Sequence, residues 1–202
     1  MNRLDVWVSA GPNGAGKSTL ARRVLIGRVP VVNPDDLAAE IDLANRDMPV
    51  VQVAAGRKAL AAREAHLEAK RSFAIETTLT GRSELELMRR ARDRSFRVNL
   101  VFIGLDDVAL SATRVAQRVR EGGHNVPAAD LQRRFTRSLA HLAPALMIAD
   151  RAWVFDNSGE QRKLILARRR LQVRHLAERL PAWAEVAIPS QLRTRSEDGV
   201  KA

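Results

Sequence analysis

The sequence predicts one three-layer α/β domain with a mostly parallel sheet of about five strands. Three observations lead to this prediction. Short β-rich apolar runs alternate with segments in which apolar residues recur at helical spacing. Residues 98–104 are almost continuously apolar, which is typical of a central parallel strand covered on both faces. A first strand, loop, helix and second strand fit within about thirty residues, the length of a βαβ unit.

The expected elements follow one another in a single domain of residues 1–188. Strands are predicted at residues 4–9, 29–32, 72–77, 98–104 and 152–155. Helices are predicted at residues 17–26, 49–71, 83–94, 107–121, 130–149 and 160–180. The last of these helices is strongly basic. The polar segment 189–202 is expected to be a flexible tail.

Positive charge dominates the composition, with 34 Lys and Arg residues against 23 Asp and Glu residues and a formal charge of +11. This excess fits either nucleic-acid binding or arginines that bind small anions beside a solvated basic surface. The absence of cysteine excludes disulfide bonds, thiolate metal sites and a cysteine nucleophile. Neither a leader peptide nor an apolar run of about 18 residues is found. We therefore expect a cytoplasmic protein without a membrane segment.

A glycine-rich loop after the first expected strand carries the strongest functional signal. The pattern G-x-x-x-x-G-K-[ST] is matched by Gly11, Pro12, Asn13, Gly14, Ala15, Gly16, Lys17 and Ser18, with Thr19 following. Glycines let the backbone wrap around phosphates with its N–H groups pointing inward, and the next helix adds its positive end. Lys17 is expected to reach the β and γ phosphates, and the Ser18 hydroxyl to ligate Mg²⁺. The loop therefore predicts binding of ATP and Mg²⁺.

The same loop sequence occurs in ABC-type ATPases, but the rest of the chain argues against that class. An ABC domain needs a signature of the L-S-G-G-Q type and a Walker B strand that ends in Asp-Glu. Neither is present in the sequence. Residues 79–82, Leu-Thr-Gly-Arg, are only a fragment of such a signature and come too early in the chain.

A series of short motifs follows the loop. It comprises Asn-Pro-Asp-Asp at 33–36, Ala-Gly-Arg at 55–57, Glu-Thr-Thr-Leu-Thr-Gly at 76–81, an arginine and Gly-Gly segment at 114–127, Arg-Arg-Phe at 133–135 and Asp-Asn-Ser-Gly at 156–159. As a set, these motifs resemble the zeta-toxin-like branch of P-loop kinases, whose small members are often labelled "predicted ABC-type ATPase". The resemblance spans about residues 10–160. It implies a kinase-like P-loop fold with a short helical lid near residues 114–134.

Asp35 follows the second expected strand, at the strand end where open α/β sheets bind ligands. Phosphoryl transfer to a hydroxyl needs a carboxylate that orients the nucleophile and accepts its proton. The resemblance gives this role to Asp35. An N-cap for a helix that begins near Leu37 is the alternative explanation, and Asp36 can fill that cap while Asp35 serves as the base.

The resemblance also implies that Glu76 and Thr78 help to hold the acceptor substrate. Glu76 could instead support Mg²⁺ through another ligand, and a solvated strand end would explain both residues without a function. Arg57 is either a contact for an anionic substrate or a surface residue of its helix.

Arg114 and Arg118 lie one helical turn apart, on a different face from the apolar stripe. The resemblance places them in a lid over the ATP phosphates, where guanidinium groups stabilise charge in the transition state. Arg118 and Arg134 are the expected catalytic pair, and a solvated arginine ladder is the alternative. The glycines at 122–123 would give the lid a hinge. Asn157 follows the last expected strand, where related kinases hold adenine, and is a nucleotide-binding candidate.

The expected activity is transfer of the ATP γ-phosphate to a hydroxyl of a small anionic acceptor. Zeta toxins phosphorylate UDP-N-acetylglucosamine, so the resemblance implies a UDP-sugar as first acceptor and an antitoxin protein as partner. One alternative is a P-loop kinase that acts on nucleic-acid ends through the basic run 162–174. That run lacks interleaved aromatic residues for base stacking, which makes nucleic acid the weaker expectation. The other alternative is a slow ATPase switch without a phosphoryl acceptor.

Overall fold

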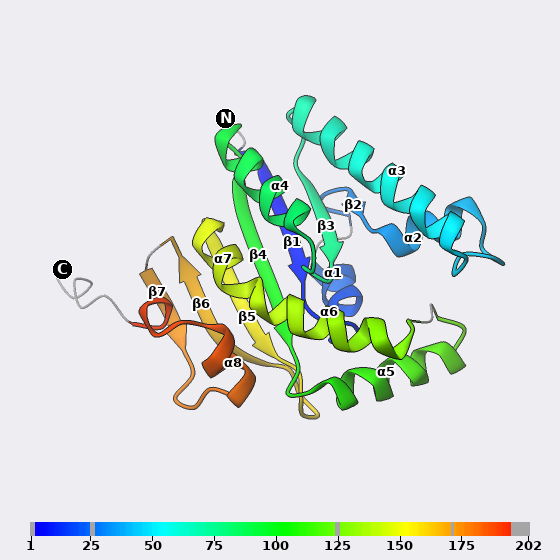
Figure 1. Ribbon diagram of the computed structural model, residues 1–202. Helices are drawn as coiled ribbons and strands as arrows, with labels where there is room; N and C mark the ends of the chain where they lie inside the picture. The colour runs from blue at the N-terminus through cyan, green and yellow to red at the C-terminus, as the bar shows by residue number, and fades with distance from the viewer. Residues whose placement is uncertain (1–2, 25–26, 124–125, 171, 195–202) are drawn as a thin grey trace.

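The computed structural model describes residues 3–24, 27–123, 126–170 and 172–194. A seven-stranded sheet of order β2-β3-β1-β4-β5-β6-β7 forms its centre (Figure 1). The strands are β1 (Asp5–Ala10), β2 (Val31–Val32), β3 (Phe73–Thr77), β4 (Arg97–Gly104), β5 (Arg151–Asp156), β6 (Lys163–Arg169) and β7 (Gln172–Leu176). Strands β1 to β5 are parallel, and β6 and β7 are antiparallel additions. The predicted α/β fold is confirmed, with two strands more than expected.

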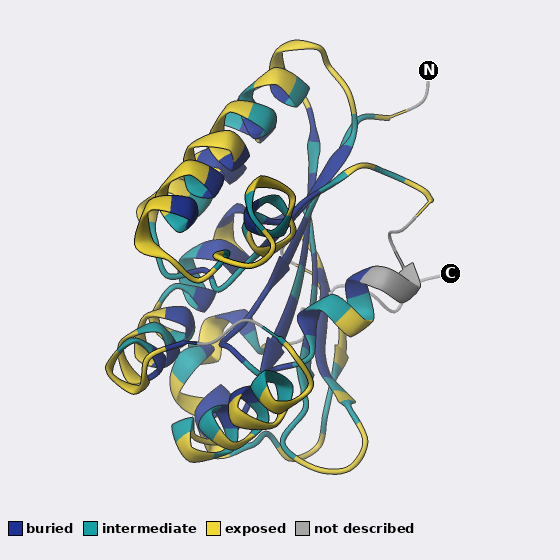
Figure 2. Cartoon of the chain, turned by 90° about the vertical axis from the view of Figure 1, so that its right-hand side faces the viewer, coloured by how far each residue is buried: buried dark blue, intermediate teal, exposed yellow. Residues whose placement is uncertain are grey.

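The helices form two unequal layers on the sheet (Figure 2). They are α1 (Lys17–Val24), α2 (Pro34–Ile41), α3 (Pro49–Glu68), α4 (Arg82–Asp93), α5 (Val108–Arg120), α6 (Ala128–Ala140), α7 (Leu142–Ile148) and α8 (Ala182–Ala187), with a 3₁₀ turn η1 (Ser190–Leu192). Within the described ranges, α1 is the single helix packed on one face, where Ala21 meets Ala74. The helices α3, α4, α7 and α8 cover the opposite face and enclose the main core.

The main core shows why these strands lie in the centre of the sheet. Successive side chains of a strand point to opposite faces, so every second residue meets the larger helix layer. On β1, β4 and β5 these residues include Val8, Leu100 and Val154, each with no exposed surface. Met88 of α4 and Leu146 of α7 pack against them. The carboxyl ends of these strands thereby lie together at one edge of the sheet, next to α5 and α6 (Figure 1).

The predicted helix at 130–149 is wrong in one respect, because it consists of two helices, α6 and α7, that meet at His141. In a continuous helix the amide of residue 144 would donate to the carbonyl of Ala140. Residue 144 is proline, which has no amide hydrogen, so the helical ladder cannot run through this point.

The predicted basic helix at 160–180 is wrong, because the segment forms the hairpin of β6 and β7. Leu, Ala and Arg favour helices, but propensity is a weak signal, and here antiparallel pairing of β6 with β5 overrides it. Arg170 adopts a positive φ of 54° at the turn. Arg168 is only 5% exposed, and its Nη1 donates to the Leu146 carbonyl at 3.4 Å, so this arginine is structural rather than part of a basic surface.

Beyond the hairpin, the chain stays packed through η1, where Leu192 joins the main core. The segment expected to be a flexible tail is therefore folded at its start, and residues 195–202 lie outside the described ranges. The predicted helix end at 25–26 and residues 124–125 of the expected lid also lie outside them. In the described part of the chain, no helix combines the length and apolar character needed to cross a bilayer.

Candidate active site

The glycine-rich loop turns between β1 and α1, as the sequence predicts. Strand β1 ends at Ala10 and helix α1 begins at Lys17. Gly11 has a φ of 140°, and a Cβ there would lie 2.1 Å from the Ile103 carbonyl oxygen. Gly14 has a φ of 71°, and a Cβ there would lie 2.9 Å from a backbone oxygen of α5. Only glycine fits these two positions, because side chains are disfavoured at positive φ and the space is already filled.

Neighbouring elements hold the loop in this shape. The Ser111 hydroxyl donates to the Asn13 carbonyl at 2.7 Å, and the Asn157 side-chain amide donates to the Ala15 carbonyl at 2.9 Å. Arg114 in turn donates to the Asn157 carbonyl at 2.7 Å. The loop is thus fastened to α5 and to the segment after β5, which preorganises its backbone N–H groups for an anion. Asn157 contacts the loop and does not line the cavity described below.

Two charged groups are buried directly beneath the loop. Lys17 is 9% exposed, and its Nζ donates to the Pro12 carbonyl at 2.8 Å. Burial lowers the pKa of Lys17 to about 8, against the opposing attraction of the Glu76 and Asp35 carboxylates. The Ser18 hydroxyl donates to Glu76 Oε1 at 2.7 Å. Burial raises the pKa of Glu76, while Lys17 and the Ser18 hydroxyl act in the opposite direction.

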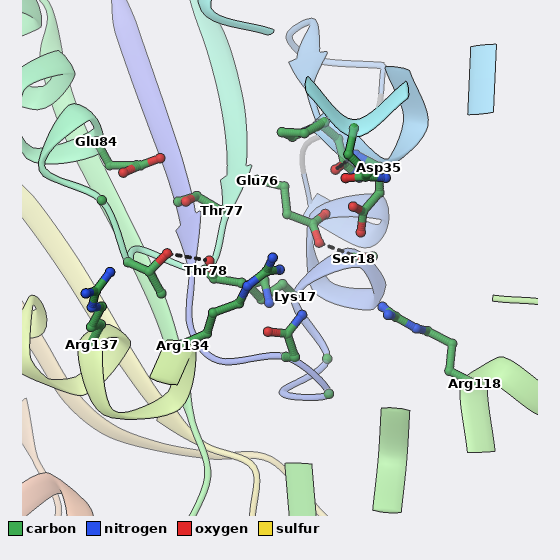
Figure 3. A pocket seen from close by; sticks show the side chains of 18 of the residues that line it. Lys17, Ser18, Asp35, Glu76, Thr77, Thr78, Glu84, Arg118, Arg134 and Arg137 are labelled. Atoms are coloured by element: carbon green, nitrogen blue, oxygen red, sulfur yellow. Dashed lines mark hydrogen bonds between the residues drawn. The ribbon is translucent and has the colours of Figure 1, made fainter. Parts of the chain in front are cut away.

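A cavity of about 600 Å³ opens above these groups at the carboxyl ends of the strands. It is lined by the loop, the starts of α2 and α4, the end of β3, and side chains from α3, α5 and α6. Most of the side chains predicted to act in the site reach this space (Figure 3). They are Asn13, Lys17, Ser18, Thr19, Asp35, Glu76, Thr78, Arg114, Arg118 and Arg134. Arg118 and Arg134 come from two different helices, α5 and α6, so the cavity is walled by cations on both sides.

Two expectations near α2 and α3 need correction. The N-cap of α2 is Asn33, whose Oδ1 accepts from the Asp35 amide at 3.1 Å, so neither aspartate is the cap. Asp35 lines the cavity, whereas Asp36 lies in the same helical turn but outside it. Arg57 is exposed on α3 and does not reach the cavity.

Sequence reasoning missed the arginine that α3 does contribute. Arg63 is 5% exposed, and its Nη1 lies 3.7 Å from Oε1 of Glu84 on α4. Both side chains line the cavity. Further lining residues not anticipated from the sequence are Gln52, Thr77, Thr80, Arg133 and Arg137. A signal for Arg63 exists, because it falls on the buried stripe of α3 that continues through Ala59 and Leu67 at four-residue spacing. An arginine within such a stripe must reach a polar space.

The described residues contain no group of three His, Asp or Glu side chains that could hold a metal ion by themselves. The Ser18 hydroxyl and the Glu76 carboxylate are nevertheless hard oxygen donors, which Mg²⁺ prefers. Mg²⁺ usually keeps several waters and binds through substrate phosphates plus one or two protein oxygens. These two residues therefore suit an ion that arrives together with a nucleotide.

Comparison with known proteins supports the same fold. Residues 6–144, more than half of the chain, match the family AAA_33, an AAA domain. An uncharacterized protein of Haemophilus influenzae is 32% identical over 131 residues, which cover 61% of this chain and 92% of that protein. The PezAT toxin–antitoxin system of Streptococcus pneumoniae matches with a TM-score of 0.61 and 15% identity over 82% of this chain and 70% of that one. The AvrRxo1-ORF1:-ORF2 structure with ATP matches with a TM-score of 0.60 and 16% identity over 99% and 66%. These structural matches establish a P-loop kinase-like fold.

Proposed function

Since the chain belongs to the AAA_33 family of AAA domains, we propose that it is an ATP-dependent phosphotransferase of the zeta-toxin-like kind, which acts on a small anionic acceptor. One observation carries the proposal. Lys17, the Ser18 hydroxyl and the Asp35 carboxylate, which suit phosphate binding, metal binding and proton acceptance, all face one cavity. An ATPase without an acceptor needs no base at position 35, whereas transfer to an acceptor hydroxyl needs a proton acceptor there.

In the proposed reaction, ATP is the phosphoryl donor, and it would bind on the loop together with Mg²⁺. Lys17, now hydrogen-bonded to the Pro12 carbonyl, would hold the β and γ phosphates, and the Ser18 hydroxyl, now hydrogen-bonded to Glu76, would hold a magnesium ion that neutralises phosphate charge. Asp35 accepts the proton of the acceptor hydroxyl. The hydroxyl oxygen then bonds to the γ-phosphorus, the bond to the β–γ bridging oxygen breaks, and ADP leaves.

The proposed lid residues stabilise the charge of this transition state. Arg118 and Arg134 face the cavity from α5 and α6, so both can contact the transferring phosphoryl group. Arg114 joins the loop to this lid through its bond to the Asn157 carbonyl. The glycine at 122 has a φ of 81°, a conformation that suits a hinge after α5.

The acceptor is proposed to occupy the part of the cavity beyond Glu76 and Thr78. Arg63 and Arg137 line this part, together with Glu84. Cations here favour an acceptor that carries phosphate or carboxylate groups. A UDP-sugar such as UDP-N-acetylglucosamine meets this requirement, and the sequence resemblance makes it the first acceptor to test. Cytoplasmic location and an antitoxin partner belong to the same proposal.

The geometry argues against a kinase that holds nucleic acid on the basic run 162–174. That run forms the β6–β7 hairpin at the far side of β5, with Arg168 buried against α7. Arg169 and Arg174 line a groove at the amino ends of the parallel strands. The cavity that holds Lys17 lies at the carboxyl ends of those strands. A polynucleotide bound in the groove would not present its end to Lys17.

The direct test is incubation with γ-labelled ATP, Mg²⁺ and a panel of UDP-sugars, nucleosides, small sugars and 5′-hydroxyl oligonucleotides. Lys17→Ala serves as the control. Transfer of label to a UDP-sugar is the expected result. Label on the oligonucleotides would move the assignment to a nucleic-acid kinase. Free phosphate with no labelled acceptor across a broad panel would contradict the proposed transfer.

A further inference from the structure

The face of the sheet that carries α1 is incompletely covered. On this face, called the open face below, Trp7 of β1, Val101 of β4 and Trp153 of β5 remain partly exposed. On the opposite face Val8, Leu100 and Val154 are fully buried. Within the described ranges, no helix other than α1 packs on the open face (Figure 2). Central parallel strands are normally covered on both sides, so this exposure of large aromatic residues needs an explanation.

A small apolar cavity lies in the middle of the open face. Its volume is about 220 Å³, and it is lined by Trp7, Ser9, Leu20, Ala21, Val101, Trp153 and Phe155. The two tryptophan rings stack with their centroids 5.8 Å apart and their planes 14° apart. The Ser9 hydroxyl is 2% exposed and has no hydrogen-bond partner among the described residues. The cavity therefore has the size and chemistry to hold one apolar or aromatic side chain that brings a polar group.

A basic groove adjoins this cavity at the amino ends of the strands. Its volume is about 510 Å³, and it is lined by Arg3, Arg97, Asp150, Arg151, Arg169, Arg170, Gln172 and Arg174. Arg151 precedes Trp153 by two residues on β5 and pairs with Arg169 of β6, so both arginines lie on the open face. Burial, followed by the positive charges of Arg97 and Arg169, lowers the pKa of Arg151. In the described part of the chain, no carboxylate is within ion-pair distance of Arg151 or Arg169.

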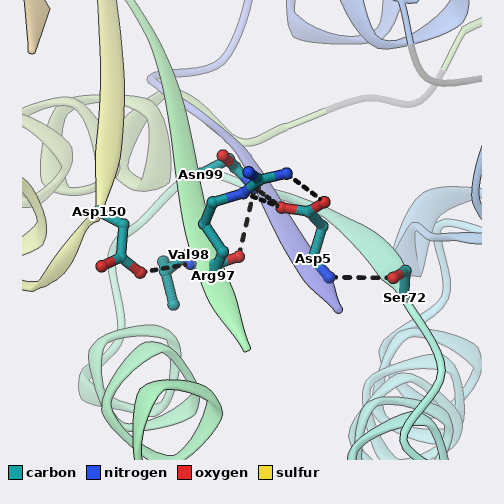
Figure 4. Close-up of polar contacts among 6 residues, drawn as sticks. All are labelled: Asp5, Ser72, Arg97, Val98, Asn99 and Asp150. Carbon is teal, nitrogen blue, oxygen red and sulfur yellow. Dashed lines mark hydrogen bonds and ion pairs between the residues drawn. The ribbon is translucent and has the colours of Figure 1, made fainter. Parts of the chain in front are cut away.

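The carboxylates near the groove already have partners (Figure 4). Asp5 accepts from Arg97 Nε at 2.5 Å and from Asn99 Nδ2 at 2.7 Å. Asp150 accepts from the Val98 amide at 2.9 Å. The open face thus combines an aromatic cavity with the guanidinium groups of Arg151 and Arg169, which have no carboxylate within ion-pair distance among the described residues, although Asp5 attracts Arg151 from farther away.

We propose that the open face binds an acidic segment of a partner protein, which places an apolar side chain between Trp7, Leu20 and Phe155 and its carboxylates on Arg151 and Arg169. Aromatic anchors beside arginines are the residues that dominate binding energy in protein interfaces. A second copy of this chain is a poor occupant, because each copy has a formal charge of +11 and the two would repel. Nucleic acid is disfavoured because each tryptophan already has one ring face against the other, and Phe155 is the one further aromatic ring in the lining of this small cavity.

A pair of synthetic polymers tests this proposal. Fluorescein-labelled poly(Glu,Tyr) offers carboxylates and apolar anchors, whereas poly-Glu of equal length offers carboxylates alone. Both polymers are attracted to the other basic surfaces of the chain, so the ratio of the two dissociation constants is the readout. The proposal predicts that poly(Glu,Tyr) binds about tenfold more tightly at physiological salt.

Three variants of the full chain locate the binding. Trp153→Ala should remove the preference for poly(Glu,Tyr), and Arg151→Glu should weaken its binding about tenfold or more. Arg82→Glu changes an exposed arginine on α4, on the covered face, and should change binding by less than about twofold. Arg151→Glu leaves the aromatic cavity in place, so it remains informative if Trp153→Ala does not fold. Thermal melting checks the folding of each variant.

Equal affinity for the two polymers, or unchanged binding by Trp153→Ala and Arg151→Glu, would overturn the proposal. If a single-stranded oligonucleotide bound more tightly than poly(Glu,Tyr), and both variants weakened its binding, the ligand of the open face would be nucleic acid and not a protein segment. If sedimentation showed a dimer of the wild type and a monomer of Trp153→Ala, the occupant of the open face would be a second copy of this chain. None of these outcomes depends on the phosphoryl-transfer reaction, because the readout is binding of a polymer to the open face and no ATP is consumed.

Discussion

Both ends of the parallel strands are rich in arginine, but the two sets of arginines have different surroundings. At the carboxyl end, Arg118 and Arg134 wall a cavity whose floor holds the buried Lys17 and Glu76. At the amino end, Arg151 and its neighbours line a groove with no buried lysine and no glycine-rich loop. The difference shows that positive charge alone does not identify a reaction site. A reaction site is identified more reliably by buried ionisable groups with shifted pKa values that lie beside preorganised backbone donors.

The largest expected effect comes from removing the buried lysine at the carboxyl end. Lys17→Ala should abolish both the rise in melting temperature caused by ATP–Mg²⁺ and detectable phosphoryl transfer, because the β and γ phosphates lose their cation. Arg151→Ala removes a cation at the amino end and should leave both properties unchanged. Thermal melting with and without ATP–Mg²⁺ checks this. A normal shift in Lys17→Ala would contradict the assignment of the loop.

A second prediction separates two neighbouring carboxylates. Asp35→Asn should slow transfer by about 10² to 10⁴-fold while ATP binding persists, because the hydroxyl loses its proton acceptor. Asp36→Asn makes the same chemical change in the same helical turn, but Asp36 lines the neighbouring pocket beside Ser18 and Glu76 rather than the cavity itself, so the expected loss is less than about tenfold. Single-turnover rates of the two variants measure the difference. Equal rates for Asp35→Asn and wild type would remove Asp35 from the role of base.

A third prediction follows from the pKa of Lys17, which burial holds at about 8 in the empty site. Bound phosphates favour the ammonium form, so ATP binding above this pH must take up a proton. The affinity for ATP–Mg²⁺ should be constant below about pH 7 and fall roughly tenfold by about pH 9. Calorimetric titration at the two pH values measures this, and Lys17→Arg, which stays charged, should show a flat profile. A flat profile in the wild type would argue against a Lys17 pKa lowered to about 8.

The smallest effect is expected at the amino end, where the charges contribute stability rather than chemistry. Burial alone would raise the pKa of Asp5, but hydrogen bonds from Arg97 and Asn99 outweigh it and hold that pKa below its ordinary value of 3.8. A depressed carboxyl pKa stabilises the fold above the unfolded-state value, and the contribution is lost as pH falls through the folded-state value. Asp5→Asn should therefore cost about 1–2 kcal/mol near pH 7, and the difference from wild type should shrink below about pH 4. Urea denaturation at the two pH values tests this, and a constant difference would speak against the ion pair.

The sequence was sufficient for the parallel core of the fold and insufficient for its edge. Strands such as 98–104 were predictable because burial on both faces demands a nearly continuous apolar run. The β6–β7 hairpin was not, because its Leu, Ala and Arg residues favour helices and its strand geometry comes from pairing with β5. The break between α6 and α7 had a visible cause in Pro144, but the surrounding helical periodicity concealed it.

In the candidate site, too, some residues could be predicted from the sequence and others could not. The loop residues were predictable because backbone geometry restricts what they can be: a side chain at Gly11 would collide with the Ile103 carbonyl. Arg63 was not recognised, because its role depends on the depth at which α3 packs, which periodicity does not reveal. Arg57 was expected instead, and it points to solvent on the same helix. The position of Asn157 behind the loop likewise depends on how two distant segments meet.

The hairpin that extends the sheet also determines how copies of the chain behave in concentrated solution. Strand β7 is the last in the sheet order, and an outer strand can pair with the same strand of another molecule and start aggregation. Arg174 is exposed along this strand, and the opposite edge strand, β2, is only two residues long. Two copies that approach edge to edge therefore bring arginine against arginine. The arrangement favours colloidal stability, so the chain should remain dispersed at concentrations where an uncharged edge of this length would form fibrils.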